Sequence, residues 1–275
     1  FSPSETVIID YILQKGLEIK DMTISQIAQQ TYTSAPLFVR IAKKLGYDGW
    51  NELKEAYLKE LEYLYLNQQV DVNIPFVIND DMMTIANNLC ILERETIQDT
   101  YSLLRHDDLQ KAMRLLRDCQ VIDVYGRKQN IDIARSFQSR MYILKQHVQL
   151  CSLSDELDST YLLSDHNHCA IIVSYSGHAP CIQRLIQTLK KKGTAIIAIT
   201  NIEENYLSQM ADVTLKMSSR EFIYTKIADY ASSLSLKYLF DLLYSCLFSI
   251  HYKQNLDSCI KIAMELDELQ HEEFM

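Results

Sequence analysis

The residues best placed for chemistry follow a short apolar run at 169–173 and precede a helical pattern over residues 180–191. They are Ser174, Ser176, Gly177 and His178. In a loop between a strand end and a helix start, backbone N–H groups, the positive end of the helix dipole and serine hydroxyls can converge on one point, and this arrangement binds phosphate. The alternative is structural, with Ser176 or His178 capping the helix and Gly177 making the turn.

Two other loops could contribute to the same site, because both follow apolar runs of the same kind. One is Gly126-Arg127-Lys128-Gln129-Asn130, and the other opens at Thr200. Guanidinium and ammonium groups pair well with phosphate, so Arg127 and Lys128 are candidate ligands of an anion.

The strand pattern predicts how these loops come together. Five short β-rich runs, at 121–125, 148–151, 169–173, 195–199 and 213–217, alternate with helical patterns such as 130–145 and 180–191. This alternation predicts an α/β domain with a mainly parallel five-stranded sheet flanked by helices, and the two most apolar runs, 169–173 and 195–199, should be central. Ligands of such sheets bind beyond the carboxyl ends of the strands, where the loops at Gly126, Ser174 and Thr200 begin.

A second candidate site lies within residues 23–54, where the sequence predicts two short helices joined by a tight turn. A weak capping box at Thr23 and the apolar stripe that follows predict a first helix from Ile24 to Gln30. The second helix should reach about Leu45, and Gly46 should end it. Helical spacing directs Leu37 or Phe38, Ile41 and Leu45 inward.

The outer face of this second helix combines a small, polar start with three cations. Its candidate DNA-binding residues are Thr33, Ser34, Ala35, Arg40, Lys43 and Lys44. The start of such a helix suits base edges in the major groove, and the flanking cations suit phosphates. The alternative is an ordinary helical hairpin with a solvated basic face.

The 275 residues, 48% of them apolar, are best divided into two domains. Helical patterns at 5–15 and 50–66 flank the helix pair and predict an N-terminal all-α bundle. The expected boundaries are 1–66 for this domain, 67–80 for a linker and 81–275 for the α/β domain, which should begin with amphipathic helices at 80–104 and 109–118.

Composition excludes several classes of protein. The net charge of −9 argues against nonspecific coating of nucleic acid but not against a specific repressor. Seven scattered cysteines without a C-x-x-C pair indicate reduced thiols of a cytoplasmic protein, and no secretory signal is evident. The apolar segment Leu234 to Ile250 contains Lys237 and Asp241 and is expected to be a core or interface helix rather than a membrane span. His166 and His168 lack the ligand spacing of a metal site, and no cofactor is expected.

The N-terminal motif resembles a known family. The run from Ile24 through Ser34, followed by Val39-Arg40, Lys43-Lys44-Leu45-Gly46-Tyr47 and Gly49-Trp50-Asn51-Glu52-Leu53-Lys54, is similar to the N-terminal domain of RpiR-type transcriptional regulators. The resemblance covers roughly residues 3–66. It implies a DNA-binding helix–turn–helix, followed by a sugar isomerase (SIS) domain that senses a phosphosugar.

The α/β part resembles SIS domains over about residues 109–244. In that family the pattern S-x-S-G, followed by Glu or Asn and then Thr, binds the phosphate; Ser174, Ser176 and Gly177 match it, whereas His178 and Ala179 do not. A protonated His178 could replace the missing threonine donor. Together, the loop chemistry and the resemblance give these candidate ligand-binding residues: Gly126, Arg127, Lys128, Asn130, Ser174, Ser176, Gly177, His178 and Thr200.

The first loop departs from the family, which usually shows G-x-G-x-S. Lys128 stands in place of a glycine and Asn130 in place of the serine. Two interpretations follow: Arg127 and Lys128 bind a more highly charged or differently shaped anion, or the pocket has drifted and binds weakly or not at all.

The resemblance also leaves a choice between sensor and enzyme. Glu221 stands where SIS isomerases tend to have a catalytic glutamate, although a single glutamate after a strand more often favours a helix dipole at a helix start. Because the exposed cations of the N-terminal helix have no evident use in an isomerase, we expect a regulator and not an enzyme. Its expected partners are a double-stranded DNA operator and a phosphosugar, and it should act as a homodimer or dimer of dimers through helices 80–104 and 234–252, because operators are usually two-fold.

Overall fold

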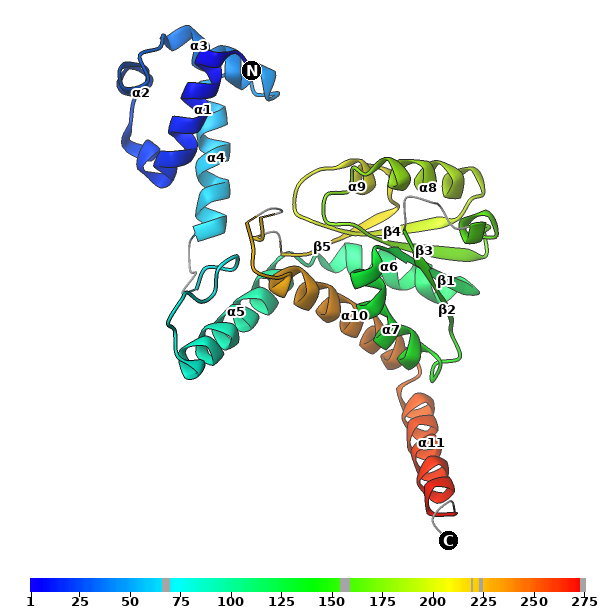
Figure 1. The fold of residues 1–275 in the computed structure, drawn as a ribbon. Coiled ribbons are helices and arrows are strands. Elements are labelled where there is room, and N and C mark those ends of the chain that lie inside the picture. The colour runs from blue at the N-terminus through cyan, green and yellow to red at the C-terminus, as the bar shows by residue number, and fades with distance from the viewer. Residues whose placement is uncertain (66–69, 154–158, 219, 223–224, 273–275) are drawn as a thin grey trace. The chain divides into compact units, whose positions relative to one another are not determined.

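The computed structural model describes residues 1–65, 70–153, 159–218, 220–222 and 225–272 of the chain. The chain divides into two compact units, Phe1–Gln69 and Val70–Met275 (Figure 1). Each unit is built around its own apolar core, so each is described separately below.

The first unit is all-helical. Its elements are α1 (Pro3–Lys15), the 3-10 helix η1 (Gly16–Asp21), α2 (Ile24–Gln30), α3 (Ala35–Lys44) and α4 (Trp50–Tyr65). Capping boxes at Ser2 and Thr23 begin α1 and α2. Buried side chains from all five of these elements fill the centre, and the rings of Phe38 and Trp50 meet edge to face at 4.9 Å. The unit therefore positions α2 and α3 on a shared core.

The predicted helix pair is present, with a turn that the sequence did not reveal. Tyr32 has φ +52 and is almost fully exposed, so it occupies the left-handed position that a glycine often takes. Phe38 and Ile41 are buried as expected, but Leu45 is half exposed. The expectation for Leu45 was wrong because the residue follows the last turn of α3, as its C-cap, and no longer keeps the helical spacing.

The second unit alternates strands and helices. Its elements are α5 (Met82–Ser102), α6 (His106–Asp118), β1 (Val121–Gly126), α7 (Lys128–Met141), β2 (His147–Ser152), η2 (Ser159–Leu162), β3 (His168–Val173), α8 (Pro180–Lys191), β4 (Ala195–Thr200), α9 (Tyr206–Met210), β5 (Val213–Lys216), α10 (Tyr230–Ile250) and α11 (Tyr252–Glu272). The five strands pair in the order β2-β1-β3-β4-β5, and every pair is parallel. The α/β prediction is confirmed, and β3 and β4 lie inside the sheet as expected.

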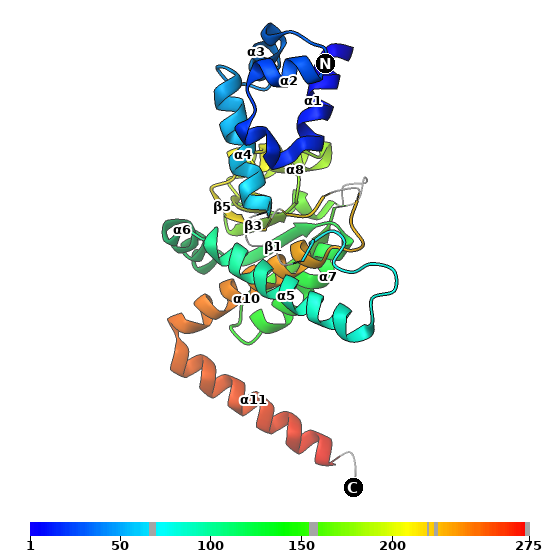
Figure 2. The same ribbon diagram turned by 90° about the vertical axis from the view of Figure 1, so that its left-hand side faces the viewer.

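Helices cover both faces of the sheet (Figures 1 and 2). Along β3, Cys169, Ile171 and Val173 face the core beneath α6, α7 and α10. The alternate residues Ala170 and Ile172 face α8 and α9. All five side chains are buried, which explains why this strand is apolar throughout rather than alternating.

Helix α10 is long and apolar enough to cross a membrane by length and composition alone, but the core helix of a soluble protein passes the same test. Seven of its side chains are buried, and it packs against α5, α6 and α7. The hydroxyls of Thr100 in α5 and Ser235 in α10 lie 2.7 Å apart in this contact. In this unit α10 is a core helix.

The residues before α5 pack onto the second unit. The expected linker was 67–80, of which 67–69 lie outside the described residues. Val70, Val72 and Asn73 are buried, and the Asn88 side chain in α5 donates a hydrogen bond of 2.9 Å to the carbonyl oxygen of Pro75. Much of the segment therefore belongs to the α/β unit.

Candidate functional site

A cavity of about 560 Å³ lies beyond the carboxyl ends of the strands in the second unit. The residues after β1, β2, β3 and β5 and the first turns of α7, α8 and α10 surround it. Its lining residues are Arg127, Gln129, Asn130, Leu153, Val173, Ser174, Tyr175, Ser176, Ala179, Cys181, Ile182, Met217, Phe222, Lys226, Asp229, Ser232 and Ser233. This is the edge of a parallel sheet where ligands bind.

Three helices begin at this cavity, and two of them present uncapped N-termini. Arg127 precedes α7 and Ala179 precedes α8, and neither side chain makes a cap hydrogen bond. The first N–H groups of a helix have no partner within the helix and carry part of its positive dipole. With Ser174 and Ser176 between them, the two helix starts form a site that favours an anion.

The loop after β3 is held by hydrogen bonds that leave its serines at the cavity. The Gly177 N–H donates to the Ser174 hydroxyl at 3.2 Å. The Thr200 hydroxyl donates to the carbonyl oxygen of Tyr175 at 3.1 Å and accepts from the Asn205 side chain at 2.9 Å. Thr200 is fully buried, so it positions the loop rather than lining the cavity.

Gly177 has a backbone conformation and a close neighbour that only glycine tolerates. Its φ is +64, and a Cβ atom would lie 2.1 Å from the Oδ1 atom of Asn205. Asn205 cannot move aside easily, because it is buried and its side chain also caps α9. The close approach of these two residues fixes the curve of the loop.

The loop after β5 supplies a cation. The Lys226 ammonium donates to the Glu221 carboxylate at 2.8 Å and also pairs with Asp229. Burial opposes the charged form of Lys226, but these two hydrogen bonds outweigh it and raise the pKa of Lys226 above its ordinary value. Lys226 is therefore a charged group that borders the cavity.

Glu221 itself does not line the cavity. It is 4% exposed, and its carboxylate accepts hydrogen bonds from the N–H groups of Ala231 and Ser232 and from the Ser232 hydroxyl. It thus closes the N-terminus of α10 and neutralises Lys226. These contacts match the interpretation of Glu221 as a charge that favours the dipole at a helix start.

The structure brings together four of the residues expected to bind a ligand: Arg127, Asn130, Ser174 and Ser176. The lining does not include Gly126, Gly177, His178 or Thr200; the two glycines shape the backbone, and His178 is exposed. Lys128 begins α7, but its side chain lies outside the described part of the chain.

Sequence reasoning missed the residues that follow β5. They are Met217, Phe222, Lys226, Asp229, Ser232 and Ser233. The carboxyl end of β5 lies at the same edge as those of β3 and β4, so the rule that selected the other loops could have selected this one too. Ser218 and Ser219 follow this strand, but residues 217–229 contain no glycine, so no phosphate-loop motif marked the segment.

The helix pair of the first unit presents a different kind of surface. Ala35, Arg40 and Lys43 of α3 are exposed, and so is its N-cap, Ser34. Thr33 is half-buried, and its hydroxyl lies 2.8 Å from that of Thr31. Lys44 is committed elsewhere: its ammonium pairs with the buried Glu5 carboxylate at 2.7 Å. Arg40 and Lys43 are the cations of this helix that remain directed at solvent.

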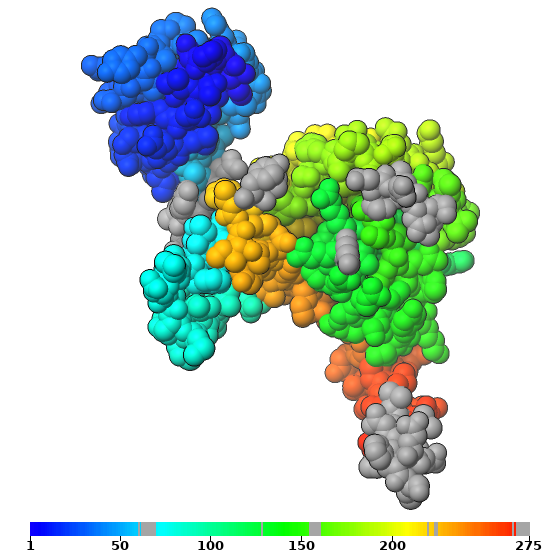
Figure 3. Space-filling view, in the orientation of Figure 1, coloured from blue at the N-terminus to red at the C-terminus, as the bar shows by residue number. Residues whose placement is uncertain are grey.

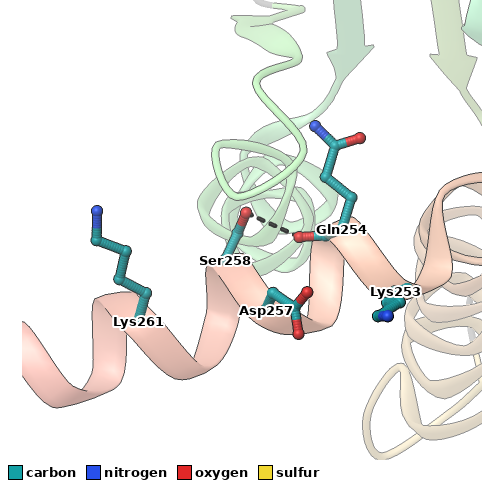
Figure 4. Close-up of a pocket in the computed structure, with 5 residues that line it drawn as sticks. All are labelled: Lys253, Gln254, Asp257, Ser258 and Lys261. Atoms are coloured by element: carbon teal, nitrogen blue, oxygen red, sulfur yellow. Dashed lines mark hydrogen bonds between the residues drawn. The ribbon is translucent and has the colours of Figure 1, made fainter.

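A further hollow lies on α11, lined by Lys253, Gln254, Asp257, Ser258 and Lys261 (Figure 4). All five side chains come from one helix, and the only interaction drawn among them joins the Ser258 hydroxyl to the carbonyl oxygen of Gln254. Figure 3 shows α11 beyond the body of the α/β unit, and Tyr252 and Met264 are exposed on it. No strand end of the described residues borders this hollow, and its lining residues all come from α11, so it lacks the converging strand ends and helix starts of the larger cavity.

Each of the two units matches the model of a known protein family. The first 63 residues match the model of the helix–turn–helix domain of the rpiR family, and residues 115–243 match the model of the SIS domain.

Two relatives extend over most of the chain. The uncharacterized HTH-type transcriptional regulator TTE0211 of Caldanaerobacter subterraneus subsp. tengcongensis is 26% identical over 227 residues, which cover 82% of this chain and 78% of the relative. The uncharacterized HTH-type transcriptional regulator YbbH of Bacillus subtilis is 24% identical over 244 residues, covering 88% and 84% of the two chains.

Solved structures share the fold. The Vibrio vulnificus NanR protein, complexed with ManNAc-6P, superposes with a TM-score of 0.62 at 21% identity and covers 98% of this chain and 94% of NanR. The sugar isomerase domain of an RpiR transcription factor from Sphaerobacter thermophilus gives a TM-score of 0.55 at 13% identity, covering 65% and 98%. With an rpiR-family helix–turn–helix domain followed by a SIS domain, the chain belongs to the RpiR-type transcriptional regulators.

Proposed function

We propose that this protein is a DNA-binding transcriptional regulator of sugar-metabolism genes, and that its SIS domain binds a phosphosugar in the cavity beyond the strand ends. The observation that carries the proposal is the pair of uncapped helix starts, at α7 and α8, that flank Ser174 and Ser176. These groups suit a phosphate, and Arg127 adds positive charge to the same cavity, whereas the charge of Lys226 is already paired with Glu221 and Asp229.

The ligand class follows from the two halves of the cavity. The α7 and α8 starts favour the phosphate, while Gln129, Asp229 and Ser233 offer donors and acceptors to sugar hydroxyls. NanR, which shares the fold, is complexed with ManNAc-6P, and this supports a phosphosugar as the effector. Arg40 and Lys43 on α3, with Ser34 and Ala35 at its start, form the proposed DNA contact.

We further propose a cytoplasmic homodimer or dimer of dimers that acts away from membranes. A two-fold assembly suits the symmetry of operators. The exposed Ile97 and Tyr101 of α5 and Ile250 of α10 are apolar groups available for such an interface.

A calorimetric titration tests the ligand site. We expect one phosphosugar from a panel that includes N-acetylmannosamine 6-phosphate and glucose 6-phosphate to bind, and its unphosphorylated form to bind far less. Ser176→Ala should weaken binding about tenfold or more, since a hydrogen bond to a charged group is lost. Ser245→Ala, on the exposed side of α10, serves as the control. Equal affinities for wild type and Ser176→Ala would remove Ser176 from the site.

Two other functions remain distinguishable by experiment. A phosphosugar isomerase would interconvert aldose and ketose phosphates, which NMR would detect; turnover abolished by Glu221→Gln would replace the proposed function. Against this, the Glu221 carboxylate is occupied by Lys226 and the start of α10. A regulator with a degenerate sensor would give no thermal shift with any sugar phosphate at millimolar concentration.

A further inference from the structure

The chain enters the α/β unit directly beside the loop that lines the cavity. The first unit ends at Gln69, and Val70, Val72 and Asn73 are already buried in the second. Val72 packs against Leu92 of α5 and Ala231 at the start of α10. The entry segment, defined here as residues 70–73, is thus part of the unit that contains the cavity.

Asn73 fastens this entry segment to the cavity loop, residues 220–222 and 225–229. Its side-chain Oδ1 accepts from the Phe222 N–H at 2.7 Å, and its carbonyl oxygen accepts from the Ile227 N–H at 2.9 Å. Its side-chain amide also reaches the carbonyl oxygen of Arg220 at 3.4 Å. The residue is 5% exposed, so water does not replace these bonds.

The same loop borders the cavity. Phe222 and Lys226 line it, and Tyr175, which also lines it, donates from its hydroxyl to the carbonyl oxygen of Glu221 at 3.0 Å. A ligand that contacts Lys226 or Phe222 therefore touches a loop whose backbone is bonded to Asn73. No other described residue before α5 receives a backbone hydrogen bond from this loop.

We infer that Asn73 couples occupancy of the cavity to the DNA-binding unit, an inference that rests on the proposed function. A ligand changes DNA affinity only if it binds two states of the protein differently. The two states that we propose are those in which the cavity loop keeps or loses its bonds to Asn73. The loop would transmit this difference to the entry segment, four residues from the end of the first unit.

Linkage makes the inference measurable. If a ligand changes the affinity for DNA by a given factor, DNA changes the affinity for the ligand by the same factor. We call this ratio the coupling factor, and it is typically about 5–150-fold. The probes are a labelled duplex selected by the wild-type protein from a random-sequence pool, and N-acetylmannosamine 6-phosphate, glucose 6-phosphate and fructose 6-phosphate. Affinity for the duplex is measured in the absence and presence of each sugar phosphate.

We expect Asn73→Ala to bind the duplex and the sugar phosphate separately, with the coupling factor reduced to near one. Asn88→Ala is the matched control, because it removes a side-chain amide that bonds the same chain segment, at Pro75, without touching the cavity loop. It should keep the wild-type factor. If Asn73→Ala does not fold, Asn73→Leu keeps the volume of the buried side chain but removes the acceptor for the Phe222 N–H, and a reduced factor is expected there too.

The outcomes separate the two proposals. A wild-type coupling factor in a folded Asn73→Ala or Asn73→Leu variant would overturn the role of Asn73 and leave the proposed function intact. Both the proposed function and the role of Asn73 would be overturned if the wild-type protein bound no sugar phosphate, or if a bound sugar phosphate left its affinity for DNA unchanged.

Discussion

The ammonium of Lys44 lies 2.7 Å from the carboxylate of Glu5, which is 1% exposed, and thereby joins the end of α3 to the first turn of α1. Glu5 also accepts the backbone N–H of Ser2 at 2.7 Å, so it caps one helix and pairs with another. The pair separates the roles of neighbouring cations: Lys44 stabilises the first unit, whereas Lys43 is exposed.

Lys44→Ala is expected to lower the unfolding temperature of the first unit by several degrees. The substitution leaves the Glu5 carboxylate buried without its cation, and uncompensated charge is costly. Lys43→Ala, one residue away on the exposed face, should leave the unfolding temperature unchanged. Differential scanning calorimetry of both variants checks this, and equal melting of the two would show that the pair is not a stabilising contact.

The first unit should also lose stability in acid. The Lys44 hydrogen bond, followed by that of Ser2, lowers the pKa of Glu5 from its ordinary 4.5 to about 2. Because the folded state binds the proton less readily, the contribution of Glu5 is complete above 4.5 and is lost as the pH falls toward about 2. Urea unfolding across this window should show a weaker pH dependence for Glu5→Gln than for wild type. Identical slopes would contradict the assignment.

Arg40→Ala is expected to weaken operator binding more than it changes folding. If Arg40 contacts a base edge, the loss should be about 1–3 kcal/mol and depend on sequence. Lys43→Ala, as a phosphate contact, should weaken all duplexes alike and reduce the salt slope by about 1. Fluorescence anisotropy at several salt concentrations distinguishes the two, and an unchanged affinity for Arg40→Ala at fixed salt would remove it from the DNA surface.

Gly177→Ala should disrupt the serine loop. The new Cβ would meet the Asn205 Oδ1 atom, and φ +64 is unfavourable for alanine. We expect a loss of more than about 1 kcal/mol of stability together with loss of phosphosugar binding. Gly193→Ala is a control for the cost of placing alanine at a positive φ, because Gly193 also has a positive φ but its Cβ would make only ordinary van der Waals contact. Chemical denaturation and calorimetry together test this, and equal effects of both substitutions would exclude the clash with Asn205.

Local pattern was enough to predict most of the fold. Short β-rich runs placed all five strands, and the period of 3.6 placed the helix pair, because strand and helix formation depend on residues within a few positions of one another. The Ser174 to Gly177 loop was found for the same reason, since it follows directly after a buried strand. Leu45 was misplaced because a helix end depends on capping as well as on spacing.

The sequence by itself determined a helix–turn–helix unit, an α/β unit with a parallel sheet, and a serine-rich loop suited to phosphate. Only the tertiary structure decided which side chains meet across long distances in the chain. It paired Lys44 with Glu5, enclosed Glu221 at the start of α10, brought Lys226 to the cavity and bonded Asn73 to Phe222. Such contacts join residues as many as 149 positions apart, and they depend on how the elements pack rather than on any local preference.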